Sequence, residues 1–517
     1  MVRDFLSVLI VLAAAAGCRG GNGIGESCGG NDDCDSALQC LHQRCVPQCD
    51  RAPECGDGYR CEDRMCVAAH GQAGDTCKSE VDCAAGLSCQ INGPEVDSVN
   101  RLVASCTAEN VTRPAGSECG DDGDCRNGTC ELGHCVDLCH DTVDCVAGSS
   151  CVTIPRVAMN GALFAGCLPS QGTLSWSIPL MSPSSEILLP VPAGASSAEL
   201  VMTVDDPGQK VGAARVLDPS GYTLFEPCAP APHASSCTPT QARDQYFANA
   251  VRHLPGFGES VLLLPSSPRP GLQQPGAYRV QVASFWSDGQ QIGSAVPRVR
   301  AVVQIGTGDT LQLHFFFLDL ADHACAAMTD GATLDASAAQ SAAFFQDRFV
   351  STLRSVFGRI GILVDTTSYD DIPDRPDLDG LDLADVGSLL SLGRYATGIN
   401  VFFVRSLSPI GVQAFAPNPG PAGVGSTPQS GIVVALDTLC YRGWQDVARM
   451  MAHQIARYMG LYHNVEIDVD VHPTWRDPLD DDDGGDPADN LMYFSEHIGT
   501  TLSAGQRELL IRSPVLQ

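Results

Sequence analysis

Twenty of the 25 cysteines in this 517-residue chain lie between Cys28 and Cys167, and their spacing repeats. They form five quartets with gaps of five, five and four residues, or close variants of these gaps. The quartets are Cys28, Cys34, Cys40, Cys45; Cys49, Cys55, Cys61, Cys66; Cys77, Cys83, Cys89, Cys106; Cys119, Cys125, Cys130, Cys135; and Cys139, Cys145, Cys151, Cys167. Residues 28–168 are therefore predicted to be a series of small repeats.

These repeats contain many Gly and Asp residues and few large apolar ones, as in GESCGGNDDCDSALQCLHQRC. Such segments bury too little surface to fold unaided, so cross-links must stabilise them. Without Cys18, which belongs to the N-terminal stretch considered next, the chain has an even number of cysteines, 24. An even number favours disulfides in an oxidising compartment. Zinc binding by thiolates is the alternative, but the chain has no C-x2-C pair. The pairing within a quartet stays open. The quartets resemble the small cysteine-rich repeats of secreted and surface proteins, which implies a stalk or a binding module.

The N-terminal stretch predicts export. Residues 1–17, MVRDFLSVLIVLAAAAG, combine one arginine with a short apolar core and small residues. The ending AAAGC resembles a bacterial lipobox, which implies that Cys18 becomes the lipidated N-terminus. A plain signal peptide cleaved nearby is the alternative. We expect 18–27 to be a linker and the lipid to be the membrane anchor of a cell-envelope protein.

The charge balance argues against nucleic acid as a partner. The formal net charge is −30, from 31 basic and 61 acidic residues. Binding of phosphates requires a clustered Lys/Arg surface, and the sequence has none. We interpret the acidic surface as a determinant of solubility.

Residues 171–306 are predicted to form a β-sandwich. Short β-rich runs alternate there with Pro/Gly/Ser turns, and Tyr278, Val280 and Val282 repeat with the period of a half-buried strand. The fragment LQQPGAYRVQV resembles the final strands of jelly-roll domains that accompany secreted bacterial peptidases. Cys228 and Cys237 are expected to pair across a loop.

Residues 310–517 are predicted to form an α/β domain. Strands are expected at 311–320, 361–369, 398–407 and 430–437, with helices at 341–358 and 383–393 between them. A further helix at 502–515 would close the domain. Cys325 and Cys440 are expected to form a disulfide that fastens the start of this domain near the helix after 437.

The stretch MAHQIARYMGLYHNVE, 451–466, specifies a chemistry. Read as a helix, it places His453 and Arg457 on one face, Gly460 at the helix end and His463 on the following turn. This frame resembles the metzincin metallopeptidases, whose H-E-x-x-H-x-x-G-x-x-H motif supplies three zinc ligands and a glutamate base. The resemblance also implies a methionine turn below the metal, and Met492 in DNLMYFS stands where that turn is expected.

Two positions of the motif depart from the family. The glutamate is replaced by Gln454, which cannot take a proton from water, and a general base is typically worth about 100- to 10,000-fold in rate. The middle histidine is replaced by Arg457, whose guanidinium has donors only. At about 4 Å and a dielectric of about 20, its charge would repel a divalent ion by roughly 8 kcal/mol. Zinc hydrolysis of the usual metzincin kind is therefore not expected.

Two interpretations of this remnant stay open. In the first, Arg457 places its cation near the metal position and His453 or His463 accepts its hydrogen bonds. In the second, both histidines hold a metal together with a carboxylate from 478–490, or with His472 or His497. The aspartate run with Asp480, Asp482 and Asp486 could bind calcium, but it does not match the EF-hand pattern, and a solvated acidic loop is favoured.

The sequence therefore predicts a surface lipoprotein with a disulfide-rich stalk, a β-sandwich and a metzincin-like domain with a degenerate site. Its expected function is to bind a protein or peptide without cleaving it and without a required cofactor. The alternatives are an active zinc peptidase with unusual ligands and a purely structural envelope protein.

Overall fold

The computed structural model describes part of the chain. The described residues are 26–517 except 36–37, 42, 56–58, 63, 111, 227–250, 267–271, 273, 290, 319–324, 332, 467–474, 477–478, 480–486 and 495–498. Several predictions lie outside this part: the export signal, Cys18, the Cys228–Cys237 pair, His472, His497, and the calcium candidates Asp480, Asp482 and Asp486. Within it, no helix has both the length and the apolar character needed to cross a membrane.

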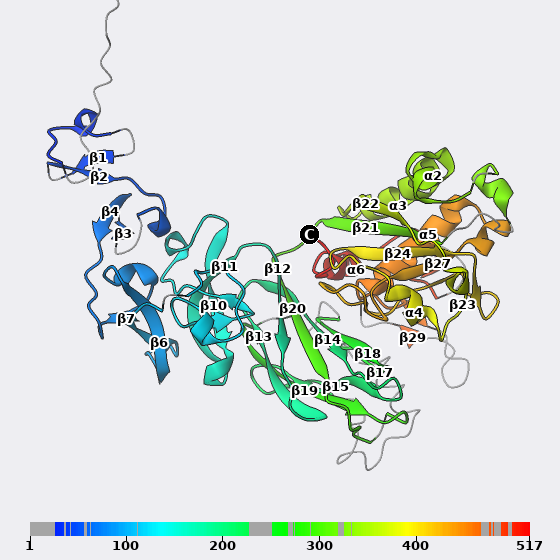
Figure 1. Cartoon of the computed structure of the whole chain (residues 1–517), viewed down its shortest axis with the longest axis horizontal. Helices are drawn as coiled ribbons and strands as arrows, with labels where there is room; N and C mark the ends of the chain where they lie inside the picture. Colours follow the sequence, from blue (N-terminus) through cyan, green and yellow to red (C-terminus); the bar gives the residue numbers. More distant parts are fainter. Residues whose placement is uncertain are drawn as a thin grey trace, which may run out of the picture.

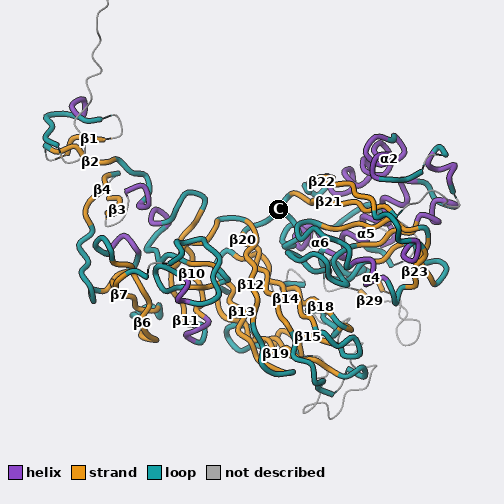
Figure 2. The backbone as a smooth tube through the Cα atoms, viewed as in Figure 1, coloured by secondary structure: helices purple, strands orange, loops and turns teal. Residues whose placement is uncertain are grey.

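Three bodies follow one another along the molecule (Figure 1), and strands dominate the first two while helices gather in the third (Figure 2). The first body contains the cysteine quartets. In all five, the first cysteine pairs with the third and the second with the fourth. The bonds are Cys28–Cys40, Cys34–Cys45, Cys49–Cys61, Cys55–Cys66, Cys77–Cys89, Cys83–Cys106, Cys119–Cys130, Cys125–Cys135, Cys139–Cys151 and Cys145–Cys167.

Each quartet is built on a β-hairpin. The third and fourth cysteines stand opposite each other in its register, and each bonds to an earlier cysteine. Since disulfides of this density persist in oxidising compartments, they indicate an extracellular or exported chain. The strands are β1 (Leu38–Leu41), β2 (Arg44–Pro47), β3 (Tyr59–Glu62), β4 (Met65–Ala68), β5 (Thr76–Cys77), β6 (Leu87–Val96), β7 (Leu102–Ala108), β8 (Cys130–Glu131), β9 (His134–Cys135), β10 (Ser149–Arg156) and β11 (Ala162–Pro169).

The second body is a sandwich of two antiparallel sheets. One has the order β12-β20-β14-β18, and the other has the order β13-β19-β15-β16, with β17 beside β15. Apolar side chains of both sheets form one core because alternate residues of each strand point inward. The strands are β12 (Gly172–Ile178), β13 (Ser184–Val191), β14 (Ala195–Thr203), β15 (Lys210–Leu217), β16 (Thr223–Phe225), β17 (Gly256–Phe257), β18 (Glu259–Leu264), β19 (Gly276–Phe285) and β20 (Arg298–Ile305).

The third body is a five-stranded sheet with helices on both faces. Its order is β22-β21-β24-β27-β26, parallel except for β26. The strands are β21 (Thr310–Phe317), β22 (Leu363–Asp371), β24 (Ile399–Val404), β26 (Ala414–Phe415) and β27 (Ile432–Ala435); short pairs are formed by β23 (Gly380–Asp382) with β25 (Ser406–Ser408) and by β28 (Val465–Glu466) with β29 (Trp475–Arg476). The helices are α2 (Ala336–Ser341), a π-helical segment (Phe344–Val350) that continues into α3 (Ser351–Gly358), α4 (Val386–Leu390), α5 (Trp444–Tyr458) and α6 (Ala504–Leu510).

Alternation along β21 divides the core of this body. Phe315 and Phe317 pack on the face covered by α3 and α5, whereas Phe316 packs on the face covered by α4. The disulfide between Cys325 and Cys440 joins the start of this body to the segment just before α5, as expected from the sequence. The C-terminus returns to β21, because Gln517 and Thr310 exchange main-chain hydrogen bonds.

Buried carboxylates join the sandwich to the third body. The fully buried Glu199 of β14 accepts a hydrogen bond from the Ala422 main-chain N at 2.6 Å. Glu259 of β18 accepts from Thr427 Oγ1 at 3.0 Å and from the Gln429 main-chain N at 3.1 Å. Burial raises the pKa of Glu199 to about 8 and that of Glu259 to about 7.

Candidate functional site

The site is built on helix α5. Its apolar face, with Trp444, Val447, Met451, Ile455 and Tyr458, is buried against α3 and the π-helical segment. The remaining face carries the three motif residues of the helix, and all three are half-buried: His453, Gln454 and Arg457. The apolar stripe therefore faces the core, and the three motif residues lie on the other side of the helix.

Gly460 ends the helix and turns the chain back. Its φ is +104°, a left-handed conformation that favours glycine, and a Cβ there would lie 2.5 Å from Leu263 Cδ2 of the sandwich. Tyr462 follows and donates a hydrogen bond to the Arg252 carbonyl at 3.0 Å. This contact with the sandwich holds the turn, and it brings His463 back toward the helix.

A second turn lies beneath the histidines. Met492 is fully buried, and its main-chain N donates to Asn490 Oδ1 at 2.8 Å. The side-chain amides of Asn490 and Gln506 donate to each other, at 3.0 and 3.1 Å, and this pair fastens the turn to α6. The Leu491 carbonyl of the turn accepts a hydrogen bond from His453 Nδ1 at 2.7 Å.

His453, His463 and Arg457 converge. His453 Nε2 lies 3.2 Å from His463 Nε2, and Arg457 Nη1 lies 3.1 Å from the same His463 nitrogen. The Nε atom of Arg457 is buried without a hydrogen-bond partner in the described part of the chain. Burial, followed by the neighbouring His463 and Arg457, lowers the pKa of His453 to about 3.

The hydrogen-bond donors and acceptors of these three side chains do not match. The Leu491 carbonyl can only accept, so the neutral ring of His453 carries its proton on Nδ1 and leaves a lone pair on Nε2. A guanidinium can only donate, so Arg457 requires a lone pair on His463 Nε2. The two lone pairs then face each other at 3.2 Å. His463 Nε2 cannot both accept from Arg457 and donate to His453.

These residues fit a zinc ion only in part. Two histidines at about 2.0–2.1 Å from a tetrahedral zinc have nitrogens about 3.3 Å apart, close to the 3.2 Å seen here. The motif residue expected to supply the third ligand is Arg457, which cannot offer a lone pair and brings a positive charge to this position. The described donor set is therefore two ligands and one cation.

The cysteine quartets offer no metal site among the described residues. Sulfur atoms of three cysteines cluster in each quartet, but every one of these cysteines is in a disulfide and none is a thiolate.

The structure thus brings His453, Arg457 and His463 together with the turn that contains Met492, 39 positions after His453. It also adds partners that sequence reasoning did not find, namely the Leu491 carbonyl and the Asn490–Gln506 pair. For the Asn490–Gln506 pair, the sequence signal was an amide residue, Asn490, two positions before Met492. No protein-family model matches this chain, and no curated protein is significantly similar to it.

Proposed function

We propose that 310–517 is a metzincin-like domain in which an arginine–histidine contact has replaced the metal, and that this exported lipoprotein uses it to bind a peptide or protein without cleaving it. The observation that supports this most directly is the 3.1 Å contact between Arg457 Nη1 and His463 Nε2. It puts a fixed cation beside the nitrogen that a metal would need. Gln454 on the same face adds no general base.

A specific observation favours a second candidate, a zinc peptidase with unusual ligands. The 3.2 Å separation of the two Nε2 atoms suits a pair of zinc ligands, and a cation between them would resolve the conflict of lone pairs. This candidate requires that Arg457 moves away from His463 and that further ligands come from elsewhere. The contact in hand argues against it.

The zinc content of the purified chain distinguishes the non-catalytic binding protein from the zinc peptidase. We would purify the exported chain without chelators and measure zinc by elemental analysis, beside a Gln454→Glu, Arg457→His double variant. Arg449→His is the matched control, because it adds a histidine to the half-exposed outer side of the same helix, where Arg449 pairs with Asp446. We expect about one zinc per chain in the double variant and none in the natural chain or the control.

The other results are equally informative. About one zinc in the natural chain would overturn the non-catalytic proposal and require peptidase assays. No zinc in either chain would contradict the metzincin-like assignment itself.

Binding is tested by selection from a displayed random-peptide library. Selected peptides should lose binding to a Gln454→Trp variant, which fills the half-buried face of α5, and should keep binding to an Arg449→Trp variant. A library that yields no such peptides would favour the purely structural envelope protein.

A further inference from the structure

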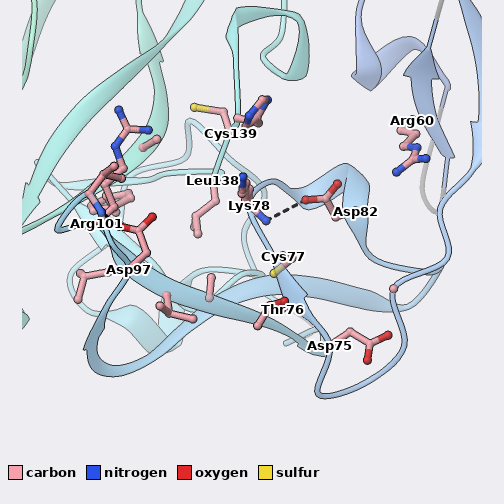
Figure 3. A pocket seen from close by; sticks show the side chains of 18 of the residues that line it. Arg60, Asp75, Thr76, Cys77, Lys78, Asp82, Asp97, Arg101, Leu138 and Cys139 are labelled. Atoms are coloured by element: carbon pink, nitrogen blue, oxygen red, sulfur yellow. Dashed lines mark hydrogen bonds between the residues drawn. The ribbon is translucent and has the colours of Figure 1, made fainter.

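A cavity lies where the second, third and fifth cysteine quartets meet (Figure 3). Its volume is about 760 Å³, within the range of roughly 300 to 1,000 Å³ that is usual for ligand sites. The walls come from Arg60 of the second quartet, from 70–82 and 97–104 around the third, and from 138–140 and 164–165 of the fifth. The cavity is therefore formed only when separate repeats pack together.

Covalent and hydrogen bonds fix this frame. Cys77 and Cys139 line the cavity, and each is in a disulfide, with Cys89 and Cys151 respectively. The bond between Cys83 and Cys106 cross-links the same third quartet. Arg51 Nη1 of the second quartet donates to the Cys145 and Val146 carbonyls of the fifth, at 3.2 and 3.1 Å. A cavity held in this way is formed before any ligand arrives, so binding loses little conformational freedom of the walls.

One wall is apolar. Leu102, Ala104, Leu138 and Phe164 belong to the core of this region and contribute to the lining. At the rim, Val99 is 67% exposed in the turn between β6 and β7. An apolar side chain of a ligand could be buried against this wall and rim.

The charged lining residues divide into two kinds. The carboxylates of Asp75, Asp82 and Asp97 accept hydrogen bonds from main-chain N–H groups of their own turns. For Lys78 and Arg101, by contrast, the hydrogen bonds seen in the described residues involve the main-chain N, which donates to Asp82 and Asp97 respectively.

Lys78 and Arg101 are both exposed, and among the described residues their charged ends form no hydrogen bond with a carboxylate. Figure 3 shows Arg101 beside Asp97 at one end of the cavity and Lys78 between that end and Asp82. Both cations attract the Asp97 carboxylate, but the hydrogen bonds that Asp97 accepts in the described residues come from the main-chain N–H groups of Val99 and Arg101. The side-chain N–H donors of Lys78 and Arg101 are therefore available to a ligand at the cavity.

We propose that this cavity binds an extended segment of a partner polypeptide in which carboxylate side chains alternate with apolar ones. Successive side chains of an extended chain point to opposite sides. One side of such a segment meets Lys78 and Arg101, and the other meets Leu102, Leu138 and Val99. This site belongs to the cysteine-rich region and is independent of the function proposed for α5.

The first test measures affinity. Fluorescein-labelled peptides of alternating Asp and Leu, Ser and Leu, or Lys and Leu are titrated with the exported chain, and anisotropy is recorded. We expect the Asp-Leu peptide to bind, and a Lys78→Ala, Arg101→Ala double variant to lose about tenfold to a hundredfold in affinity, because each cation supplies a charge-assisted hydrogen bond. Arg279→Ala is the control, since Arg279 is an exposed arginine of the sandwich and its loss should change nothing.

The second test locates the peptide. The chain has two lysines, Lys78 and Lys210, so ¹³C-dimethylation gives one lysine signal in the cavity and one on the sandwich. The Asp-Leu peptide should shift the signal of Lys78 and leave that of Lys210 unchanged.

Four results would overturn the proposal, three with the peptide and one with a polysaccharide. The three with the peptide are no binding of the Asp-Leu peptide up to about 1 mM, equal binding by the double variant, and a shift of the Lys210 signal in place of the Lys78 signal. A heparin fragment that shifts Lys78 where the peptide does not would replace the polypeptide with an anionic polysaccharide and would also overturn it.

Discussion

At the scale of single residues, the unusual feature is a shortage of protons between His453 and His463. His453 Nδ1 is committed to the Leu491 carbonyl, and Arg457 donates to His463, so both facing nitrogens need lone pairs. Protonation of His453 would relieve the conflict, but burial opposes it most, followed by the neighbouring His463 and then Arg457. The site therefore keeps a neutral His453 beside a permanent cation.

His453 should remain neutral over a wide pH range. Its pKa of about 3 means that ring ¹⁵N shifts should show a neutral imidazole through the physiological range. Arg457→Gln should raise the pKa, because a positive neighbour is removed, yet leave it below 6.5, because burial is the largest cause. His253, whose pKa is lowered to about 4 by burial in the sandwich, should not change.

The same shift has a consequence for stability. A histidine whose pKa is lowered in the folded state contributes fully above its unfolded value of 6.5, and this contribution is lost as the pH falls toward 3. A natural chain in which His453 titrates near 6.5 would contradict the buried arrangement.

At the scale of elements, an acidic residue recurs just before the second cysteine of every quartet: Asp33, Glu54, Asp82, Asp124 and Asp144. In each case the carboxylate accepts main-chain N–H groups three and four residues earlier, which closes a 3-10 turn. Part of the net charge of −30 is therefore structural, and not only a determinant of solubility.

Removing one of these carboxylates should loosen its turn. Asp124 Oδ2 accepts from Gly120 N at 2.7 Å and from Asp121 N at 3.4 Å. In Asp124→Ala, hydrogen exchange of these two amides should become faster, while Glu118→Ala, which changes a side chain nearby that makes neither of these bonds, should leave it unaltered. Unchanged exchange in Asp124→Ala would show that the disulfides alone hold the turn.

The end of α5 gives a second prediction at this scale. Gly460→Ala forces a side chain into a left-handed conformation and within 2.5 Å of Leu263 Cδ2, so we expect a loss of about 1–3 kcal/mol in the free energy of unfolding. Gly443→Ala at the other end of the helix is the control, because a Cβ added there would have no other atom within 4 Å. Chemical denaturation of both variants measures the difference, and equal stability would argue against the close approach.

At the scale of the whole molecule, the contact between the sandwich and the third body depends on protonation. Glu199 and Glu259 are buried there without a basic partner among their hydrogen bonds, which involve Ala422, Thr427 and Gln429. Tyr458 of α5 touches the same loop through its bond to the Pro421 carbonyl at 2.8 Å. The helix that carries the candidate site is thereby linked to the sandwich.

The pH dependence of this contact follows from the raised pKa values. A carboxyl whose pKa is raised in the folded state contributes fully below its unfolded value of 4.5, and the contribution is lost as the pH rises through about 7 for Glu259 and about 8 for Glu199. We expect the thermal unfolding temperature to fall between about pH 5 and pH 9. Glu199→Gln should flatten this fall, whereas Glu186→Gln, at an exposed ion pair with Arg215, should not. An equally steep fall in Glu199→Gln would contradict the proposed origin.

Local patterns in the sequence determined much of this architecture. Alternation in GAYRVQVASF predicted β19, helical spacing predicted α3 and α5, and the even count of cysteines predicted disulfides, because each of these signals depends on near neighbours. The positions of His453, Gly460, His463 and Met492 likewise predicted a common site. The strand β12 was missed, although Leu174, Trp176 and Ile178 alternate there with polar residues in the pattern of a half-buried strand.

Only the tertiary structure decided the rest. Within each quartet the first cysteine pairs with the third and the second with the fourth, and this pairing depends on how the turn folds over its hairpin. The tertiary structure also set the 3.1 Å contact of Arg457 with His463, and it joined Glu199 to Ala422 across more than two hundred residues. Such contacts depend on how finished elements pack, and no periodicity in the sequence records the distance between side chains that meet only after packing.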